Sequence, residues 1–247
     1  MLKNILKGIV IGIANVLPGV SGGTLAVVLG IYDKLTEAIG DFLLAPMKKK
    51  IEYAKFIGQI GIGAGIGILL FAKLVGFLYS TYPKITTVGF VFLIIPSIPL
   101  ILKGENLFSK KNFISFITGI LFTVLFIFLT YTFKSDVVSA PGEIVVTFSY
   151  GIKLFFCGIV AAGAMIIPGI SGSLLLLILG EYYNILSFIS SFNIIPLIFF
   201  GLGTGIGLIG FAKVINILLH RRRSETLSFI VGIIVVSVFD ILFRVFQ

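Results

Sequence analysis

The sequence predicts an all-α polytopic membrane protein with two inverted-topology repeats, each containing a re-entrant helix pair broken at a Pro-Gly motif. Three observations predict this class. Hydrophobic residues make up 58% and charged residues 12% of the 247 residues, whereas soluble domains are about half apolar and about a quarter charged. A Pro-Gly-x-Ser-Gly motif occurs twice, each time inside a long apolar stretch. The basic residues gather in short loops between such stretches, which is typical of membrane proteins.

The chain is expected to form one membrane domain over residues 1–247, because no polar stretch is long enough for a second domain. The net charge of +9 does not indicate nucleic acid as a partner, because the basic residues follow the positive-inside pattern. Cys157 is the only cysteine, which excludes an intrachain disulfide, and its apolar surroundings favour a packing role. The N-terminal segment continues into a further apolar stretch, unlike a signal peptide.

The two Pro-Gly motifs are residues 17–24 (LPGVSGGT) and 167–174 (IPGISGSL). Proline lacks the backbone N–H and clashes with the preceding helical turn. Within a bilayer, a broken helix is tolerated only where protein or a water-filled cavity surrounds the break. The motifs therefore predict two discontinuous helices and a functional site at the breaks.

Residues 1–133 form the first expected repeat. Its re-entrant pair occupies 4–45, because the arm before the first motif is shorter than the ~20 apolar residues that cross a bilayer. Full spans follow at 56–80, 86–102 and 113–133. Basic loops or a turn at Pro83 separate these spans, and Pro96 and Pro99 break the middle span late.

Residues 149–247 form the second expected repeat. Its re-entrant pair occupies 150–190, around the second motif. Full spans follow at 194–219 and 226–246, with a basic turn (HRRR) between them. The sequence thus predicts about five full spans plus two re-entrant hairpins.

Internal repetition supports this division of the chain. Matching segments occur in the same order in both halves: GIV at 8–10 and 158–160, LGIY at 29–32 and LGEY at 179–182, GIGAGIG at 61–67 and GLGTGIG at 201–207, and FAK at 71–73 and 211–213. Three spans separate the two re-entrant pairs, and this odd number inverts the second repeat relative to the first. With the N-terminus inside, twelve basic residues fall on the cytoplasmic side and three on the outer side. Inverted repeats with broken helices are typical of secondary transporters.

The two motifs are also the predicted substrate-binding site. A new helix begins at Ser21 or Ser171, which are favourable N-cap residues. Its first amides are expected to be unpaired, and such helix N-termini bind phosphate or carboxylate. The candidate residues are Pro18, Gly19, Val20, Ser21, Gly22, Gly23, Thr24, Pro168, Gly169, Ile170, Ser171, Gly172 and Ser173. The alternative is that Pro-Gly only kinks a helix for packing.

Lys73 and Lys213 are further substrate-binding candidates, because they occupy matching positions in apolar spans where a lysine is costly. Two interpretations stay open. Each lysine contacts phosphate in one access state, or it snorkels to the lipid headgroups. The alternate glycines of 61–67 and 201–207 favour close helix packing over ligand contact.

Four carboxylates near helix ends are candidates to carry a coupling proton: Asp33, Glu37, Glu181 and Asp240. An interfacial salt bridge or a solvated helix end is the favoured alternative. His220 is the only histidine, and the sequence contains no metal-ligand cluster, nucleotide-binding loop or serine–histidine pair. An enzyme is therefore not indicated, and no cofactor or metal is expected.

These motifs resemble those of the bacterial and archaeal membrane family catalogued as domain of unknown function 368. The resemblance rests on PGVSGGT followed by GIY, on IPGISGS followed by GEY, and on the FAK spans, and it covers nearly the whole chain. The two copies differ where Gly23 and Thr24 are replaced by Ser173 and Leu174, which argues against equal roles for the two halves.

Members of that family have been assigned as polyprenyl-phosphate translocases. The resemblance implies that the chain returns undecaprenyl phosphate from the outer to the inner leaflet of the cytoplasmic membrane by alternating access. The lipid substrate, membrane lipids and protons are the partners it implies. Two other classes stay open, a transporter or channel for a small soluble anion and a membrane scaffold without transport activity.

Overall fold

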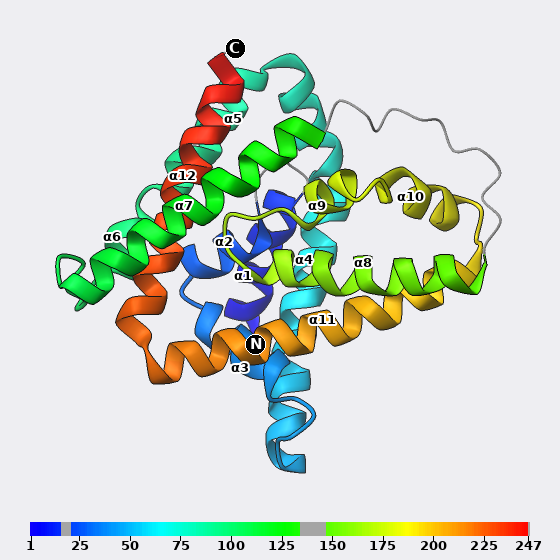
Figure 1. The fold of residues 1–247 in the computed structure, drawn as a ribbon, viewed down its shortest axis with the longest axis horizontal. Coiled ribbons are helices and arrows are strands. Elements are labelled where there is room, and N and C mark those ends of the chain that lie inside the picture. Colours follow the sequence, from blue (N-terminus) through cyan, green and yellow to red (C-terminus); the bar gives the residue numbers. More distant parts are fainter. Residues whose placement is uncertain (16–20, 134–146, 247) are drawn as a thin grey trace.

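The computed structural model describes residues 1–15, 21–133 and 147–246, and the regular elements within these ranges are all helices (Figure 1). The first half contains α1 (Leu2–Asn15), α2 (Gly22–Val28), α3 (Tyr32–Gly40), α4 (Met47–Thr81), α5 (Pro83–Ile94), α6 (Ser97–Ile101) and α7 (Lys110–Phe133). The second half contains α8 (Phe148–Ile166), α9 (Gly172–Ile178), α10 (Tyr182–Ser190), α11 (Ile194–Arg221) and α12 (Arg223–Phe246).

Five helices in the described part of the chain are long and apolar enough to cross a membrane, which confirms a polytopic all-α membrane protein. They are Met47–Phe71, Lys110–Thr132, Phe148–Ile166, Ile194–Arg221 and Arg223–Phe243. The set differs from the predicted spans in two places. The segment predicted as the span 86–102 is two shorter helices, α5 and α6, because Pro96 lies in the turn between them. By contrast, α8 is long enough to cross although the sequence indicated an arm of a re-entrant pair. The re-entrant form of the broken pairs stays a prediction.

Each broken pair consists of a long helix followed by two short ones, and the short helices correspond residue for residue. α9 and α10 each begin and end 150 residues after α2 and α3, as the bounds 22–28 and 172–178 illustrate. The LGIY and LGEY segments explain this agreement. Gly30 and Gly180 have φ angles of 64° and 73°, which glycine adopts without steric cost and which terminates the preceding helix.

Glycines also determine how the long helices pack within each half. A Cβ atom at Gly63 would lie 2.2 Å from the Ile5 carbonyl oxygen, and one at Gly203 would lie 1.9 Å from the Phe155 carbonyl oxygen. α1 therefore packs closely on α4, and α8 packs in the same way on α11. The expected close packing is confirmed at Gly63, Gly67, Gly203 and Gly207. It is wrong for the other four glycines, because nothing lies within 4 Å of a Cβ atom at Gly61, Gly65, Gly201 or Gly205.

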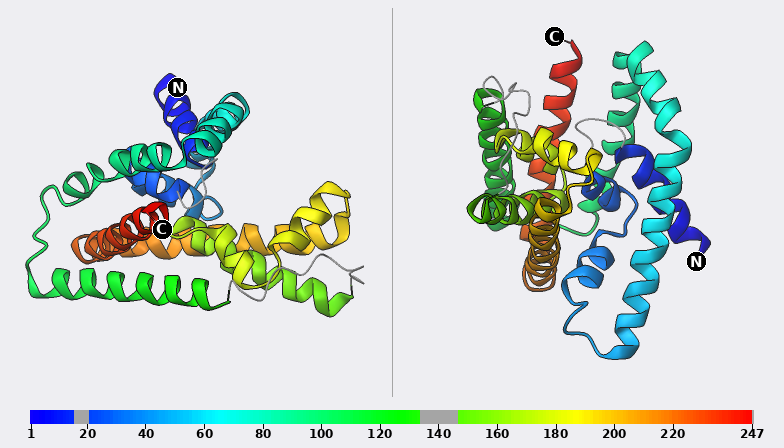
Figure 2. Two further views of the ribbon diagram at one scale, coloured as in Figure 1. Left: turned by 90° about the horizontal axis from the view of Figure 1, so that it is seen from above. Right: turned by 90° about the vertical axis from the view of Figure 1, so that its right-hand side faces the viewer.

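The pairs α1–α4 and α8–α11 lie on different sides of the molecule, and α7 packs on α12 beside them (Figures 1 and 2). The buried side chains of α12 include Ile230, Ile233 and Ile234. α3 packs along α11 and also contacts α4, so it connects the two halves.

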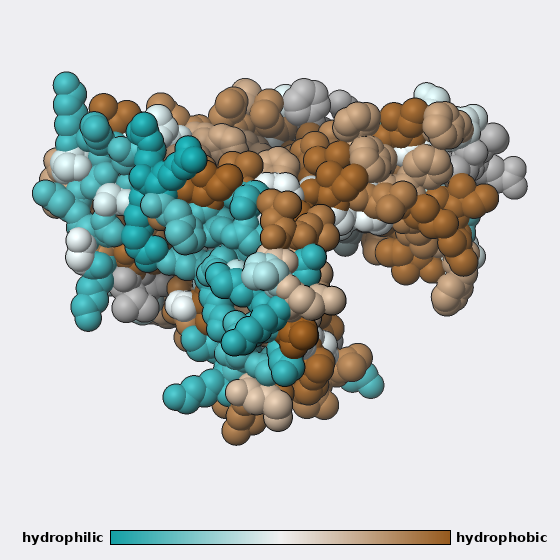
Figure 3. Space-filling model, turned by 90° about the horizontal axis from the view of Figure 1, so that it is seen from below, coloured by the Kyte–Doolittle hydropathy of each residue, from teal (hydrophilic) through white to brown (hydrophobic). Residues whose placement is uncertain are grey.

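Hydrophilic residues gather over one part of the face in Figure 3, and hydrophobic residues cover the remainder. Exposed basic residues lie at the start of α4, around the α6–α7 connection and at the α11–α12 corner. These are Lys48, Lys49, Lys103, Lys110, Lys111, Arg221, Arg222 and Arg223. They belong to the loops that the sequence assigns to the cytoplasmic side.

Candidate functional site

The two Pro-Gly motifs meet at one cavity of about 740 Å³. Its lining includes Ser21, Gly22 and Gly23 from the first motif and Ile170, Ser171, Gly172 and Ser173 from the second. The structure therefore brings together two segments about 150 residues apart, as the sequence predicts for a shared site. Pro18, Gly19 and Val20 lie outside the described residues.

Direct hydrogen bonds join the second motif to the first half and to α12. The Gly169 amide donates to Thr24 Oγ1 at 2.8 Å, and the Tyr32 hydroxyl donates to the Ile166 carbonyl at the end of α8 at 3.0 Å. The Ser237 hydroxyl of α12 donates to the Gly169 carbonyl at 2.9 Å. Gly169 has a φ of 84°, so a side chain there is strained. Pro168 is fully buried nearby. The break after α8 is thus held in place by polar contacts from both halves.

The two helix starts differ in how their amides are paired. The Gly23 amide donates to Ser21 Oγ at 3.2 Å, so Ser21 caps α2. Ser171 makes no side-chain capping bond to α9, and its hydroxyl lies 2.8 Å from the Ser173 hydroxyl. The expectation that the first amides of both helices are unpaired is therefore wrong at Gly23. The second motif presents two hydroxyls to the cavity instead.

Other polar groups line the cavity that the sequence did not single out. Asn15 lies over the start of α2, since a Cβ atom at Gly22 would be 2.9 Å from Asn15 Oδ1. Thr204 of α11 also lines the cavity, and its hydroxyl oxygen is buried without a hydrogen-bond partner among the described residues. Asn15 lies outside the repeated segments, and Thr204 lies within GLGTGIG, whose repetition indicated helix packing, so only the three-dimensional arrangement identifies the two residues as part of the cavity.

The described lining residues include no charged side chain. Lys73 is exposed on α4, and Lys213 forms an ion pair with Asp41 just after α3. The Asn216 side-chain amide donates to the other Asp41 oxygen at 2.9 Å. The predicted phosphate contact by the lysines is therefore not part of this arrangement. Asp41 was not identified from the sequence, because its partners lie more than 170 residues away.

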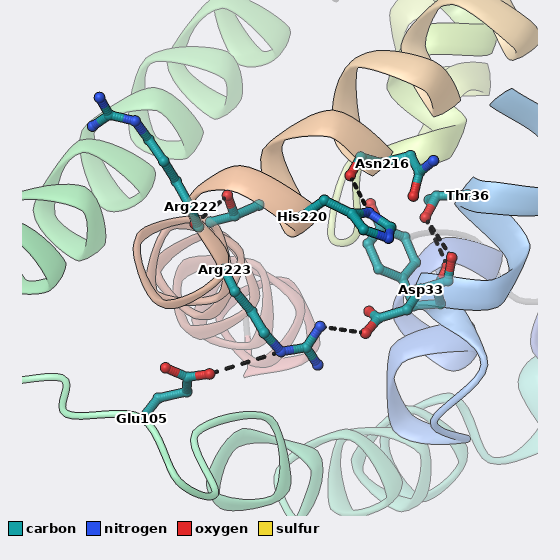
Figure 4. Close-up of polar contacts among 9 residues, drawn as sticks. Asp33, Thr36, Glu105, Asn216, His220, Arg222 and Arg223 are labelled. Atoms are coloured by element: carbon teal, nitrogen blue, oxygen red, sulfur yellow. Dashed lines mark hydrogen bonds and ion pairs between the residues drawn. The ribbon is translucent and has the colours of Figure 1, made fainter. Parts of the chain in front are cut away.

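Two of the candidate carboxylates lie in different environments. The Asp33 carboxylate lies 2.6 Å from Arg223 Nη1, and Arg223 Nε lies 3.8 Å from Glu105 (Figure 4). Glu181 is buried, with its carboxylate 2.5 Å from Lys153 Nζ. These two pairs match the salt-bridge interpretation.

Hydrogen bonds hold the carboxylates as well. The Tyr150 hydroxyl donates to Glu181 at 2.5 Å, and the Asn184 side-chain amide donates to it at 2.9 Å. Glu37 accepts from the Tyr53 hydroxyl at 2.7 Å, and Asp240 accepts from the Tyr131 hydroxyl at 3.3 Å. None of these carboxylates is among the described residues that line the cavity.

This fold and this cavity define a polytopic all-α membrane protein in which two matching helix breaks line one uncharged cavity, where a few polar groups lie among apolar side chains. The comparisons with known proteins agree with the resemblance seen in the motifs. The chain belongs to the undecaprenyl phosphate translocase-like family, whose model matches residues 11–244.

Two curated relatives are similar over most of the chain. A polyprenyl-phosphate transporter from Vibrio cholerae is 33% identical over 242 residues, which cover 94% of this chain and 74% of the relative. A polyprenyl-phosphate transporter from Staphylococcus aureus is 32% identical over 248 residues, which cover 96% of this chain and 85% of the relative. No solved structure matches the chain.

Proposed function

We infer that the protein transports a polyprenyl phosphate by alternating access and returns it from the outer to the inner leaflet of the cytoplasmic membrane for envelope synthesis. The observation that carries this function is the cavity of about 740 Å³ that both Pro-Gly motifs line. The family and the names of both relatives support the class of substrate. Transport, rather than catalysis, is the role that these names support.

The cavity suits a phosphate headgroup that is bound and then released. Hydrogen bonds to an ionised acceptor are roughly twice as strong as neutral ones, so the hydroxyls of Ser171 and Ser173 and the amide of Asn15 suffice to hold an anion. A fixed cation in the lining would slow the release of that anion. We assign substrate binding to the described motif residues Ser21, Gly22, Gly23, Thr24, Pro168, Gly169, Ile170, Ser171, Gly172 and Ser173.

The polyprenyl tail explains why the site lies in a membrane domain that is broadly apolar outside. Each CH₂ group that leaves the bilayer costs about 0.8 kcal/mol, so a long tail remains in the hydrocarbon while the headgroup moves. Apolar side chains such as Met165 and Leu208 line the cavity beside the polar groups, and Met165 is 56% exposed. This mixture fits a headgroup site that is open to lipid on one side.

The same proposal places the N-terminus and the basic loops in the cytoplasm, following the positive-inside rule. It assigns proton coupling to Glu181, because this carboxylate is buried and precedes Tyr182, which lines the cavity. Asp33 and Glu37 also follow lining residues of the cavity, Tyr32 and Thr36, but neither these two carboxylates nor Asp240 is buried as Glu181 is.

Leaflet-specific labelling of undecaprenyl phosphate tests this function in cells with and without the protein, after other carriers of this lipid have been removed. We expect deletion to abolish the inward return of the lipid. Unchanged return would reject the proposal and favour transport of a soluble anion or a scaffold role. A Ser171→Leu/Gly172→Leu variant that inserts normally is expected to behave like the deletion.

A further inference from the structure

The two repeats share their internal packing but differ in one contact between them. α3, from the first repeat, packs along α11 from the second. In the repeat, α10 corresponds to α3 and α4 corresponds to α11. Along their described lengths, α10 and α4 make no comparable contact. Both views of Figure 2 place α10 away from the C-terminal half of α4.

The α3–α11 contact is tight and polar. A Cβ atom at Gly40 would lie 2.5 Å from the Lys213 backbone nitrogen, so only glycine allows this approach. Asp41 follows directly and pairs with Lys213 and Asn216 of α11. Asp33 at the other end of α3 pairs with Arg223 at the α11–α12 corner (Figure 4).

The residues that would form the corresponding contact between α10 and α4 are exposed. α10 repeats α3 150 residues later, so Ser190 and Ser191 stand where Gly40 and Asp41 stand in the first repeat. The FAK segments make Lys73 the counterpart of Lys213. Ser190, Ser191 and Lys73 are all exposed.

The cavity lies beside this separated pair of helices. Its lining includes Ile60 of α4 on one side and Leu176 of α9 and Tyr182 of α10 on another. On α11 the lining residues are Phe200, Thr204 and Leu208, whereas the contact with α3 lies further along, at Lys213 and Asn216. The cavity is thus bounded at the basic end of α11 by the α3 contact, and no corresponding contact bounds it at α10 and α4.

We propose that the structure is one of two states that exchange these contacts, and that the Asp41–Lys213 ion pair is the latch that holds this state. In the other state α3 leaves α11, and α10 packs on α4 with Ser190 and Ser191 against Lys73. The inference rests on the proposed alternating access. Under the proposed topology, the present state is closed at the cytoplasmic face and open at the outer face.

The difference between the two contacts follows from their chemistry. The helices involved repeat each other closely, so α10 can pack on α4, but less closely than α3 packs on α11, because Ser190 carries a Cβ atom where Gly40 has none. The Asp41–Lys213 ion pair favours the α3–α11 contact over the α10–α4 contact, because Asp41 supplies a carboxylate that Ser191 lacks at the corresponding position of α10. A two-state equilibrium shifts only when a group interacts differently with the two states, and the Asp41 carboxylate is such a group.

Disulfide crosslinking in native membranes tests the exchange. The full chain with Cys157→Ala, which removes the only cysteine, receives the pair Lys73→Cys and Ser191→Cys. A disulfide needs Cα atoms within about 7 Å, so this pair reports the α10–α4 contact. We expect a small crosslinked fraction that rises several-fold when Asp41→Asn is added.

Two controls make the result specific. The pair Asn4→Cys and Gln59→Cys joins α1 to α4 within one repeat, where the two side chains are 2.7 Å apart, and its crosslinking should not respond to Asp41→Asn. Glu225→Gln breaks the Arg222–Glu225 ion pair within one helix corner and should leave the Lys73–Ser191 crosslink unchanged. Lys213→Gln is a second latch variant and should act as Asp41→Asn does.

The inference is overturned if the Lys73–Ser191 pair does not crosslink in either latch variant while the Asn4–Gln59 pair does. It is also overturned if neither latch variant raises the crosslinked fraction. These readouts do not depend on transport. Lost lipid return in the labelling experiment therefore tests the proposed function, and the crosslinking pattern tests the exchange of contacts.

Discussion

The two halves of the molecule show how a duplicated membrane fold conserves packing while its polar groups diverge. A Cβ atom at Gly8 would lie 2.3 Å from the Ile60 carbonyl, and one at Gly158 would lie 2.4 Å from the Phe200 carbonyl. The same backbone-to-backbone approach therefore joins the first and fourth helices of each half. Such close helix pairs behave as rigid units, because packed backbones have little room to deform.

The differences between the halves lie at polar positions around the site. Ser21 caps its helix, whereas Ser171 directs its hydroxyl to Ser173. The buried Glu181 stands where the first half has Ile31. The comparison shows that helix packing is shared by both halves, and under the proposed function binding and coupling belong mainly to the second.

The largest effect is expected from breaking the shared packing. Gly203→Val places a side chain against the Phe155 carbonyl, and overpacking of this kind costs ~1–3 kcal/mol or more. The free energy of unfolding in detergent should fall accordingly. Gly201→Val is the matched control, because nothing lies within 4 Å of a Cβ atom there. In the first half, Gly63→Val should likewise lower the free energy of unfolding more than Gly61→Val does. The opposite result would show that the two halves do not pack alike.

A second large effect is expected at Glu181, the carboxylate of the second half to which we assign proton coupling. Glu181→Gln keeps an acceptor for Tyr150 and Asn184 but cannot release a proton, so the chain should fold while transport loses its dependence on the proton gradient. Transport into vesicles with and without an imposed pH gradient measures this. Glu37→Gln is the control and should retain the dependence, because the Glu37 carboxylate likewise accepts from a tyrosine, Tyr53, but is not buried. A normal gradient response in Glu181→Gln would exclude this carboxylate as the proton carrier.

Ser171 and Ser21 test whether the two Pro-Gly motifs have different roles at the cavity. A hydrogen bond to a charged group is worth about 1.5–3 kcal/mol, so Ser171→Ala should lower transport by roughly ten-fold or more at unchanged stability. Ser21→Ala also removes a helix cap, which costs ~1 kcal/mol of stability, and should lower transport less than Ser171→Ala, because the Ser21 hydroxyl oxygen already accepts from the Gly23 amide. Thermal unfolding and lipid transport, measured on both variants, separate the two roles. Equal losses of transport in both variants would indicate equivalent serines.

The class of the protein and the meeting of the two motifs at one cavity could be predicted from the sequence, because both depend on local patterns. Long apolar stretches predict membrane helices, and the repeated Pro-Gly motif predicts that two breaks share one site. The second arm of each broken pair, predicted as one helix, is divided into two short helices at the glycine that follows α2 or α9. Gly30 and Gly180 are recognisable as helix-ending residues within the LGIY and LGEY segments.

The rest could not be predicted, because it depends on residues that are distant in the chain. In the sequence alone, Lys213 suggested a phosphate contact, but in the folded chain it forms an ion pair with Asp41. Asn15 lies outside the repeated segments and Thr204 lies in one that indicated only packing, and both reach the cavity through the way the helices pack. Polar pairing across elements has no local sequence signature, so each of these roles required the folded arrangement.

The smallest effect is expected from comparing the two matching lysines. Lys213→Gln removes an ion pair that is partly exposed, with side-chain exposures of 35% for Lys213 and 26% for Asp41, and such pairs contribute ~0–1 kcal/mol. Lys73→Gln alters an exposed side chain and should leave the free energy of unfolding unchanged. Thermal unfolding at low and high salt checks this, since salt should reduce the difference between the Lys213 variant and the wild type. A larger loss of stability in Lys73→Gln would mean that the exposed lysine, and not the paired one, stabilises this state.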